Sequence, residues 1–170
     1  MPVVAGPEGR PEIATYWQRA LDESGLPAFK LLLAHDRPFE HRHVVSIDFL
    51  KPQAVEGGQG FWFKACGELG EGLALHQCVL TYASDMGLVS ACLIEHGMTW
   101  MSGDIMAASL DHAIWFHRPF RADQWLLYLT DSHTSQGARG LGLGRIFTQD
   151  GVLVATTAQE CLMRIRRKDG

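Results

Sequence analysis

The sequence has no excess of basic residues and few cysteines. Its 170 residues hold 15 Lys and Arg against 19 Asp and Glu, and the longest basic stretch lies at residues 164–168. Binding to nucleic acid depends on basic side chains that neutralise phosphates, so nucleic acid is not expected as a partner. No CxxC spacing of a zinc or disulfide framework is present. We expect four small, reduced core residues at Cys66, Cys78, Cys92 and Cys161.

The chain also lacks the features of a membrane or exported protein. No window is expected to supply the ~18 to 20 apolar residues of a membrane span. The first residues, MPVVAGPEGRPE, form neither a basic nor an apolar leader segment, and the last residues carry no SKL signal. We therefore expect a cytoplasmic protein without a membrane span. A length of 170 residues, 46% of them hydrophobic, fits one domain.

Motifs for nucleotide, metal and covalent serine chemistry are missing as well. The run RGLGLGR at residues 139–145 has Arg145 where a GxGxxG phosphate loop would need glycine. There is no GxSxG elbow and no HExxH motif. His41 and His43 lie on one face of a predicted strand, but no His-rich cluster accompanies them. We expect no metal and no cofactor.

The pattern of apolar residues predicts an α+β domain. Residues 1–11 are expected to be irregular, and residues 13–34 to form two short helices interrupted by the sequence SGLP. Residues 73–93 are apolar on almost every side, which is typical of a buried helix. Strands are expected at residues 41–49, 60–66, 109–117, 125–134, 139–148 and 152–165.

Residues 150–151, Asp-Gly, predict a two-residue type I′ turn between the last two strands. The resulting register places Gln159 opposite Gly142, on a face that also carries two more glycines. The glycines of this face are Gly140, Gly142 and Gly144. Either a ligand or the central helix approaches the backbone closely there, or the glycines allow a strongly curved sheet to wrap that helix.

Asp85 is the one side chain between residues 77 and 94 that would be charged at neutral pH. It lies in the helix that we expect to be buried. Burying an unpaired carboxylate is costly or raises its pKa, so Asp85 needs partners or a function. The alternative is a structural acid that caps a kinked helix at Gly87 or bonds to core hydroxyls.

Residues 109–117, with the sequence SLDHAIWFH, are rich in polar groups for a strand. Strict alternation would place His112 on an apolar face with Leu110 and Ile114. A lone histidine in such surroundings is more often a hydrogen-bonded core residue than a catalyst. Ser109 and His112 are too close along one strand to form a serine triad with an acid, so a serine hydrolase is not expected.

Three longer motifs resemble a known family. They are LHQCVLTYASD at residues 75–85, SLDHAIWFHRPFRADQWLLY at residues 109–128 and SQGARGLGLGRIFTQDGVLVATTAQE at residues 135–160. In sequence and order they resemble the C-terminal half of the type II acyl-CoA thioesterases. The resemblance implies a hot-dog fold, in which an antiparallel sheet wraps one long helix. It also implies hydrolysis of fatty acyl-CoA to a free fatty acid and coenzyme A.

The same resemblance implies that Asp85, Ser109 and Gln159 are catalytic. These side chains would orient a water molecule for attack on the thioester, with no covalent intermediate. Ser109 stands where relatives often have threonine, and it keeps the hydroxyl. The basic residues available for the phosphates of coenzyme A are Arg118, Arg139 and Arg145.

The family that this sequence resembles carries two hot-dog units in one chain, whereas we expect one unit in this sequence. We expect residues 1–37 to form a tail and a short helical connector, and residues 38–170 to form the hot-dog domain. Active sites of this fold lie between two units, so we expect a homo-oligomer that acts on acyl-CoA. The alternatives are a non-catalytic acyl-CoA binding subunit and a half-enzyme that needs a second hot-dog partner.

Overall fold

The computed structural model describes residues 1–103 and 105–165, so residues 166–168 of the basic stretch lie outside the described residues. The helices are α1 (Ile13–Ser24), α2 (Pro27–Ala34), α3 (Leu73–Ser84) and α4 (Leu88–Ile94). The strands are β1 (Phe39–His43), β2 (Gln59–Ala65), β3 (Ile105–Ser109), β4 (Ala113–Phe116), β5 (Leu126–Gln136), β6 (Arg139–Thr148) and β7 (Leu153–Ile165).

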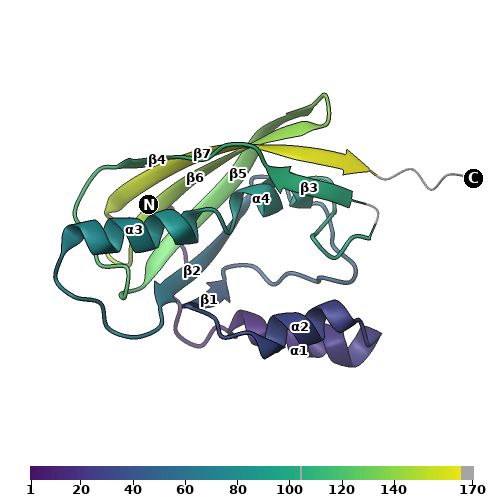
Figure 1. The fold of residues 1–170 in the computed structure, drawn as a ribbon, viewed down its shortest axis with the longest axis horizontal. Coiled ribbons are helices and arrows are strands. Elements are labelled where there is room, and N and C mark those ends of the chain that lie inside the picture. The colour runs from purple at the N-terminus through teal and green to yellow at the C-terminus, as the bar shows by residue number, and fades with distance from the viewer. Residues whose placement is uncertain (104, 166–170) are drawn as a thin grey trace, which may run out of the picture.

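The strands form one antiparallel sheet in the order β1-β2-β5-β6-β7-β3, and β4 also pairs with β7. The sheet curves around α4, which packs against β5, β6 and β7, while α3 runs along the side of the sheet (Figure 1). An antiparallel sheet wrapped around a central helix is the hot-dog arrangement. The predicted α+β fold is therefore confirmed.

The main hydrophobic core lies between the helices and the inner face of the sheet. Phe61 and Phe63 of β2 share this face because side chains alternate along a strand. They pack with Tyr128 of β5, Leu80 of α3 and Leu88 of α4, and none of these five is more than 5% exposed. Full burial of a large apolar side chain contributes about 1.5–3 kcal/mol, so this core anchors both helices to the sheet.

β6 and β7 pair in the register that the sequence predicts, with Gly142 opposite Gln159 and Gly144 opposite Thr157. A methyl group placed on Gly142 would lie 2.7 Å from the carbonyl oxygen of Leu88, closer than a carbon atom can approach. The missing side chain therefore lets the first residue of α4 lie directly on β6. Two of the features that the sequence left open are therefore observed together, because the central helix approaches the backbone closely at Gly142 and the sheet curves around that helix.

The turn between β6 and β7 differs from the prediction. A type I′ turn needs a positive φ at both central residues, and there only Gly151 has one, of 93°. Thr148 and Val152 bond to each other around a three-residue loop instead, and the pairing of the two strands shifts beside it. Positive φ values at two successive residues occur at Gly137 and Ala138, 61° and 63°, in the hairpin between β5 and β6.

The predicted helix at residues 73–93 is two helices that meet at Asp85 and Gly87. All residues of α4 except Ser90 are buried, but α3 exposes Leu75 and Tyr82 by 45% and 62%. The expectation of burial on every side is wrong for α3, because the sheet covers only one of its faces. By length and composition Leu73–Ile94 could cross a membrane, contrary to expectation, but 56% of its apolar window is buried inside this fold.

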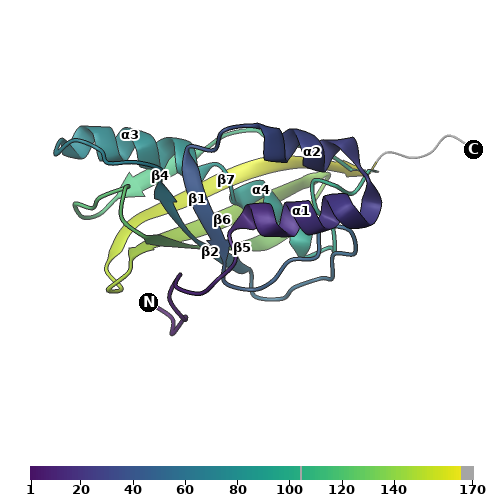
Figure 2. The same cartoon turned by 90° about the horizontal axis from the view of Figure 1, so that it is seen from below.

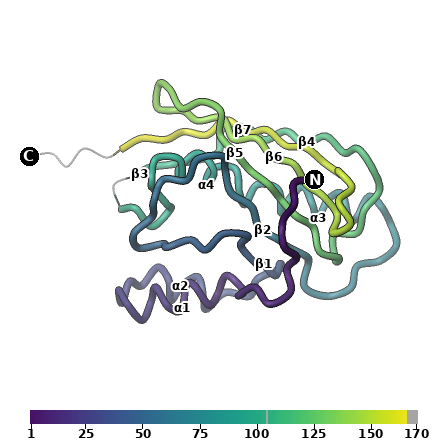
Figure 3. The backbone as a smooth tube through the Cα atoms, turned by 180° about the vertical axis from the view of Figure 1, so that it is seen from behind, coloured from purple at the N-terminus to yellow at the C-terminus, as the bar shows by residue number. Residues whose placement is uncertain are grey.

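The N-terminal residues pack beside β1. α1 and α2 lie next to each other on the β1 side of the molecule (Figure 2), and Gly25, with a φ of 65°, separates them as predicted. Residues 1–11 contain no helix or strand, and the carbonyl oxygen of Ala5 accepts a hydrogen bond of 3.0 Å from Trp62 Nε1. Figure 3 shows α1 and α2 on the opposite side of the molecule from the β5–β6 hairpin.

The four cysteines are free, but only Cys92 and Cys161 are buried. Cys66 and Cys78 are exposed, so the prediction of four core cysteines is wrong for these two. Cys66 follows the last residue of β2, and Cys78 lies in α3, the helix that the sheet leaves open on one side. The apolar residues around these two cysteines predicted burial, but they do not specify which face of a helix or strand the rest of the fold covers.

Candidate active site

Asp85 and Ser109 meet where α3 and β3 end. Ser109 Oγ donates a hydrogen bond of 3.2 Å to Asp85 Oδ1. Asp85 is the residue that caps the C-terminus of α3, and its side chain is exposed in this chain. The expectation of a buried carboxylate is therefore wrong, because the helix breaks at this residue and leaves the side chain at the surface beside β3.

Gln159 reaches the same place from β7. Its Nε2 donates a hydrogen bond of 2.6 Å to Ser109 Oγ, and the residue is only 1% exposed. The neighbouring strand offers no side chain opposite Gln159, because Gly142 stands there. The structure thus brings Asp85, Ser109 and Gln159 into one line of hydrogen bonds from the surface into the interior.

A β-bulge replaces the single strand expected at residues 109–117. β7 pairs with β3 up to Ser109 and with β4 from Ala113, and only two of its residues lie opposite the three between them. The backbone N–H of Glu160 bonds there to Asp111 Oδ1 at 2.7 Å. The extra residue interrupts the alternation, so that Ser109 and His112 both contact the same glutamine.

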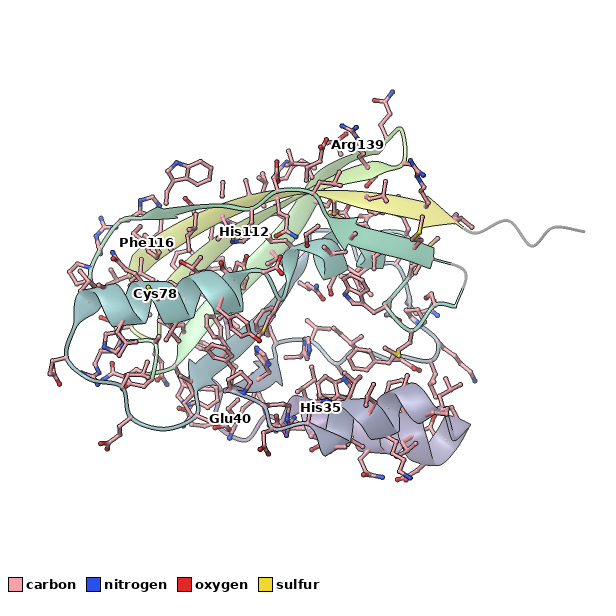
Figure 4. The ribbon with its side chains drawn as sticks, in the orientation of Figure 1. His35, Glu40, Cys78, His112, Phe116 and Arg139 are labelled. Atoms are coloured by element: carbon pink, nitrogen blue, oxygen red, sulfur yellow. The ribbon has the colours of Figure 1, made fainter. Side chains whose placement is uncertain are left out.

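His112 binds the other end of the Gln159 amide. Its Nδ1 lies 2.7 Å from Gln159 Oε1, and its Nε2 lies 2.8 Å from Ser84 Oγ. An amide oxygen only accepts, so Nδ1 carries the proton in this bond and the amide nitrogen faces Ser109. His112 is hydrogen-bonded, as predicted, but it lies between α3 and the sheet (Figure 4) rather than on an apolar strand face.

Tyr128 of β5 fixes the last turn of α3 beneath the site. Its hydroxyl donates to the carbonyl oxygen of Ser84 at 2.8 Å and lies 2.7 Å from Thr157 Oγ1. Burial above all, with a smaller contribution from the charge of Asp85, raises the pKa of Tyr128, so the hydroxyl keeps its proton. The sequence analysis did not identify Tyr128, whose role depends on contacts between residues far apart in the chain.

The site combines an exposed carboxylate, a hydroxyl and a buried amide. Ser109 Oγ contacts Asp85 and Gln159, whereas the neighbouring His112 contacts Gln159 and Ser84, so Ser109 does not form the Ser–His pair of a serine hydrolase with that histidine. No three potential ligands cluster to hold a metal ion within residues 1–103 and 105–165. Arg139 and Arg145 contact carboxylates at 3.3 and 3.6 Å, and Arg118 donates to a backbone carbonyl at 2.9 Å.

The architecture is that of the hot-dog class. A conserved hot-dog protein from Alicyclobacillus acidocaldarius superposes with a TM-score of 0.65 at 16% identity, covering 98% of this chain and 55% of its own. At that identity the likeness concerns the fold alone. A family model described as acyl-CoA thioesterase matches residues 30–162, and the chain belongs to this family.

Two relatives extend the match over nearly all of the chain. Human acyl-coenzyme A thioesterase 8 is 37% identical over 172 residues, which cover 98% of this chain and 53% of that protein. The crystal structure of an acyl-CoA thioesterase II from Mycobacterium marinum is 34% identical with a TM-score of 0.72, covering 99% and 57%. The chain therefore spans about half the length of the relatives that it matches.

Proposed function

We propose that this chain hydrolyses acyl-CoA thioesters at the site formed by Asp85, Ser109 and Gln159. The observation that carries the proposal is the continuous line of hydrogen bonds through these three side chains, in a member of the acyl-CoA thioesterase family. The names of the relatives supply the substrate class. The exposed end of the line, Asp85, is where substrate and water arrive.

Asp85 acts as the general base. Ser109 holds Oδ1, which leaves Oδ2 to accept a proton from a water molecule. The oxygen of that water attacks the thioester carbonyl carbon, the carbon–sulfur bond breaks, and the departing thiolate takes up the proton. The products are a free acid and coenzyme A. A positioned general base of this kind contributes about 10²- to 10⁴-fold to the rate.

Ser109 and Gln159 orient the base. Ser109 accepts a hydrogen bond from Gln159 and gives its own hydrogen to Asp85, so each group has a defined direction. Gln159 is buried and bound at both ends of its amide, which restricts the rotation of the donor. The carboxylate is thereby held in one orientation before substrate binds, and no ordering is needed during the reaction.

A second hot-dog unit completes the site in this proposal. Apolar side chains on α3, on and directly after β3, and next to Asp85 are 38–62% exposed in a single chain. They are Leu75, Tyr82, Met86, Met106 and Leu110. An apolar surface around a catalytic carboxylate is typical of an interface. We propose that another copy of this chain covers it, giving a homo-oligomer in which the carboxylate is shielded from bulk water.

The proposal is tested by following thiol release from a series of acyl-CoAs with the purified chain. We expect turnover that falls at least 100-fold in Asp85→Asn and substantially in Gln159→Ala. Asp22→Asn, on the exposed face of α1, is the matched control and keeps full activity. Equal rates in all three variants would contradict the assignment of the site.

The same preparation separates the alternatives. Binding of acyl-CoA without thiol release would identify a non-catalytic binding subunit. Activity that arises only when a separate hot-dog protein is added would identify a half-enzyme. Light scattering at micromolar concentration reports the oligomeric state, where a dimer or larger assembly is expected. A monodisperse monomer that is fully active would overturn the proposed pairing.

A further inference from the structure

A cavity of about 420 Å³ lies between α1, α2, β1 and the start of α4. Its walls are mostly apolar and aromatic, and include Trp17, Phe29, Phe49, Phe61 and Ile94. Cavities of about 300–1,000 Å³ with apolar walls and a few polar groups are typical of small-molecule sites. The size and lining of this cavity therefore fit an apolar ligand of moderate size.

The cavity adjoins the proposed general base. Met86 and Gly87 line it, and they follow Asp85 directly in the chain. Gly87 has Phe61 against its backbone, since a methyl group there would lie 2.9 Å from the ring. Because Met86 is also 38% exposed, one residue reaches both the surface beside Asp85 and the cavity.

Two histidines of β1 lie in the wall of this apolar space, and each carries a buried polar atom without a partner among the described residues. His41 and His43 are two positions apart, share one strand face and line the cavity. His41 Nε2 and His43 Nδ1 are buried, and neither has a hydrogen-bond partner within residues 1–103 and 105–165. Buried polar atoms normally have partners, so two unpaired nitrogens in the wall of a cavity favour an occupant with a polar group that they can reach when the rings turn toward it.

Both histidines are neutral at physiological pH. Burial lowers the pKa of His41 and of His43 to about 4, and the charges of His43 and Arg37 contribute further at His41. A neutral imidazole donates at one nitrogen and accepts at the other. Such a pair suits an uncharged oxygen, such as a hydroxyl or a keto group, better than a carboxylate, which favours a cation.

We propose that this cavity binds the acyl chain of the thioester substrate, and that His41 and His43 bind a hydroxyl or keto oxygen carried on that chain. This inference rests on the proposed hydrolysis at Asp85 and specifies the class of acyl group. The chain enters past Met86, its apolar part packs against the aromatic walls, and its oxygen pairs with the histidines. Oxygenated acyl-CoAs are then preferred over plain ones of equal length.

The histidine role is tested by comparing hydroxy-, keto- and unsubstituted acyl-CoAs of the same length. We expect kcat/KM about tenfold higher for at least one oxygenated series, as one added hydrogen bond in a dry site would give. The double variant His41→Leu, His43→Leu should lose this preference, so that kcat/KM becomes equal for oxygenated and plain substrates of the same length, whereas Leu31→Ala, at an exposed position outside the cavity, should retain it. Wild-type protein that shows no preference for any position of the oxygen would overturn the role of the histidines.

The location of the acyl chain is tested by filling the cavity. Leu32 of α2 lines it, whereas the preceding Leu31 is 61% exposed and does not. Leu32→Trp should lower kcat/KM at least tenfold more for long acyl-CoAs than for acetyl-CoA, and Leu31→Trp should leave kcat/KM for both unchanged. An equal loss for all chain lengths, with unchanged thermal unfolding, would place the acyl chain elsewhere.

A readout without turnover separates this inference from the proposed function. The ring resonances of His41 and His43 are followed by NMR during titration with a free hydroxy fatty acid, the plain acid and an ω-carboxy acid. Selective shifts with the hydroxy acid support the cavity assignment even if no acyl-CoA is hydrolysed, in which case the proposed function alone fails. Hydrolysis without any ring shift overturns the cavity assignment and leaves the hydrolytic function standing. Stronger shifts with the ω-carboxy acid would overturn the choice of an uncharged oxygen.

Discussion

His112 Nδ1 lies 2.7 Å from Gln159 Oε1, across the bulge that separates β3 from β4. This contact determines which end of the amide faces Ser109, because the imidazole N–H can only pair with the amide oxygen. The direction of every hydrogen bond from His112 to Asp85 follows from it. A residue that does not touch the proposed water thus sets the orientation of the groups that do.

His112→Ala should lower kcat at least tenfold with little change in KM. It leaves a buried amide oxygen unpaired, at a cost of about 1–3 kcal/mol, and frees the amide to rotate away from Ser109. His112→Asn, which can supply an N–H at a similar place, should restore part of kcat. Steady-state kinetics and urea unfolding on the same samples check this. A loss of stability with unchanged kcat would indicate a purely structural role.

Ser109→Ala should reduce kcat about 10- to 100-fold, because Asp85 loses a donor and Gln159 loses its acceptor. Ser109→Thr keeps the hydroxyl and adds a methyl group that restricts χ1. Its kcat should stay within a few-fold of the original protein. Ser109 is exposed, so neither variant should unfold the chain. Equal activity of the alanine and threonine variants would show that the hydroxyl is not used.

Gly142→Ala should destabilise the fold by about 1–3 kcal/mol, since its methyl group would meet the Leu88 carbonyl and push α4 from the sheet. A methyl group on Gly70 would meet nothing within 4 Å, so Gly70→Ala is the matched control. Urea denaturation of both variants measures the difference. If Gly142→Ala unfolds at the same urea concentration as the control, the close approach of α4 is not a constraint.

Stability should fall as the pH drops from about 6.5, the ordinary pKa of histidine, toward about 4, the lowered pKa of His41 and His43. In this window the unfolded chain binds protons that the folded chain does not. The loss should be on the order of 1.4 kcal/mol per pH unit for each histidine.

Urea unfolding at about pH 7 and about pH 5 measures this effect. The double variant His41→Leu, His43→Leu should lose less stability between the two conditions than the original protein, because neither leucine titrates. His96→Leu, at an exposed position, serves as the control and should behave as the original protein. Parallel losses in the double variant and the original protein would show that other groups dominate.

Local sequence determined most of the order of helices and strands, but not the breaks that divide the central helix and the strand expected at residues 109–117. It also determined the register of the last hairpin over most of its length. The glycines at alternate positions of β6 identified the place where the helix approaches, because a missing side chain is a property of the sequence alone. The motifs that resemble the acyl-CoA thioesterases selected Asp85, Ser109 and Gln159. If the chain adopts the fold of the family that these motifs resemble, the three side chains are expected to meet.

The tertiary structure decided what local patterns do not contain. The helix break that leaves Asp85 exposed depends on which face of α3 the sheet covers, and an apolar sequence does not specify that face. The bulge that turns Ser109 and His112 toward one glutamine depends on pairing with β7, more than 40 residues away along the chain. The alternation of side chains along a strand predicts their direction only while the strand pairs regularly. At this site one inserted residue changes the direction of the side chains that follow it.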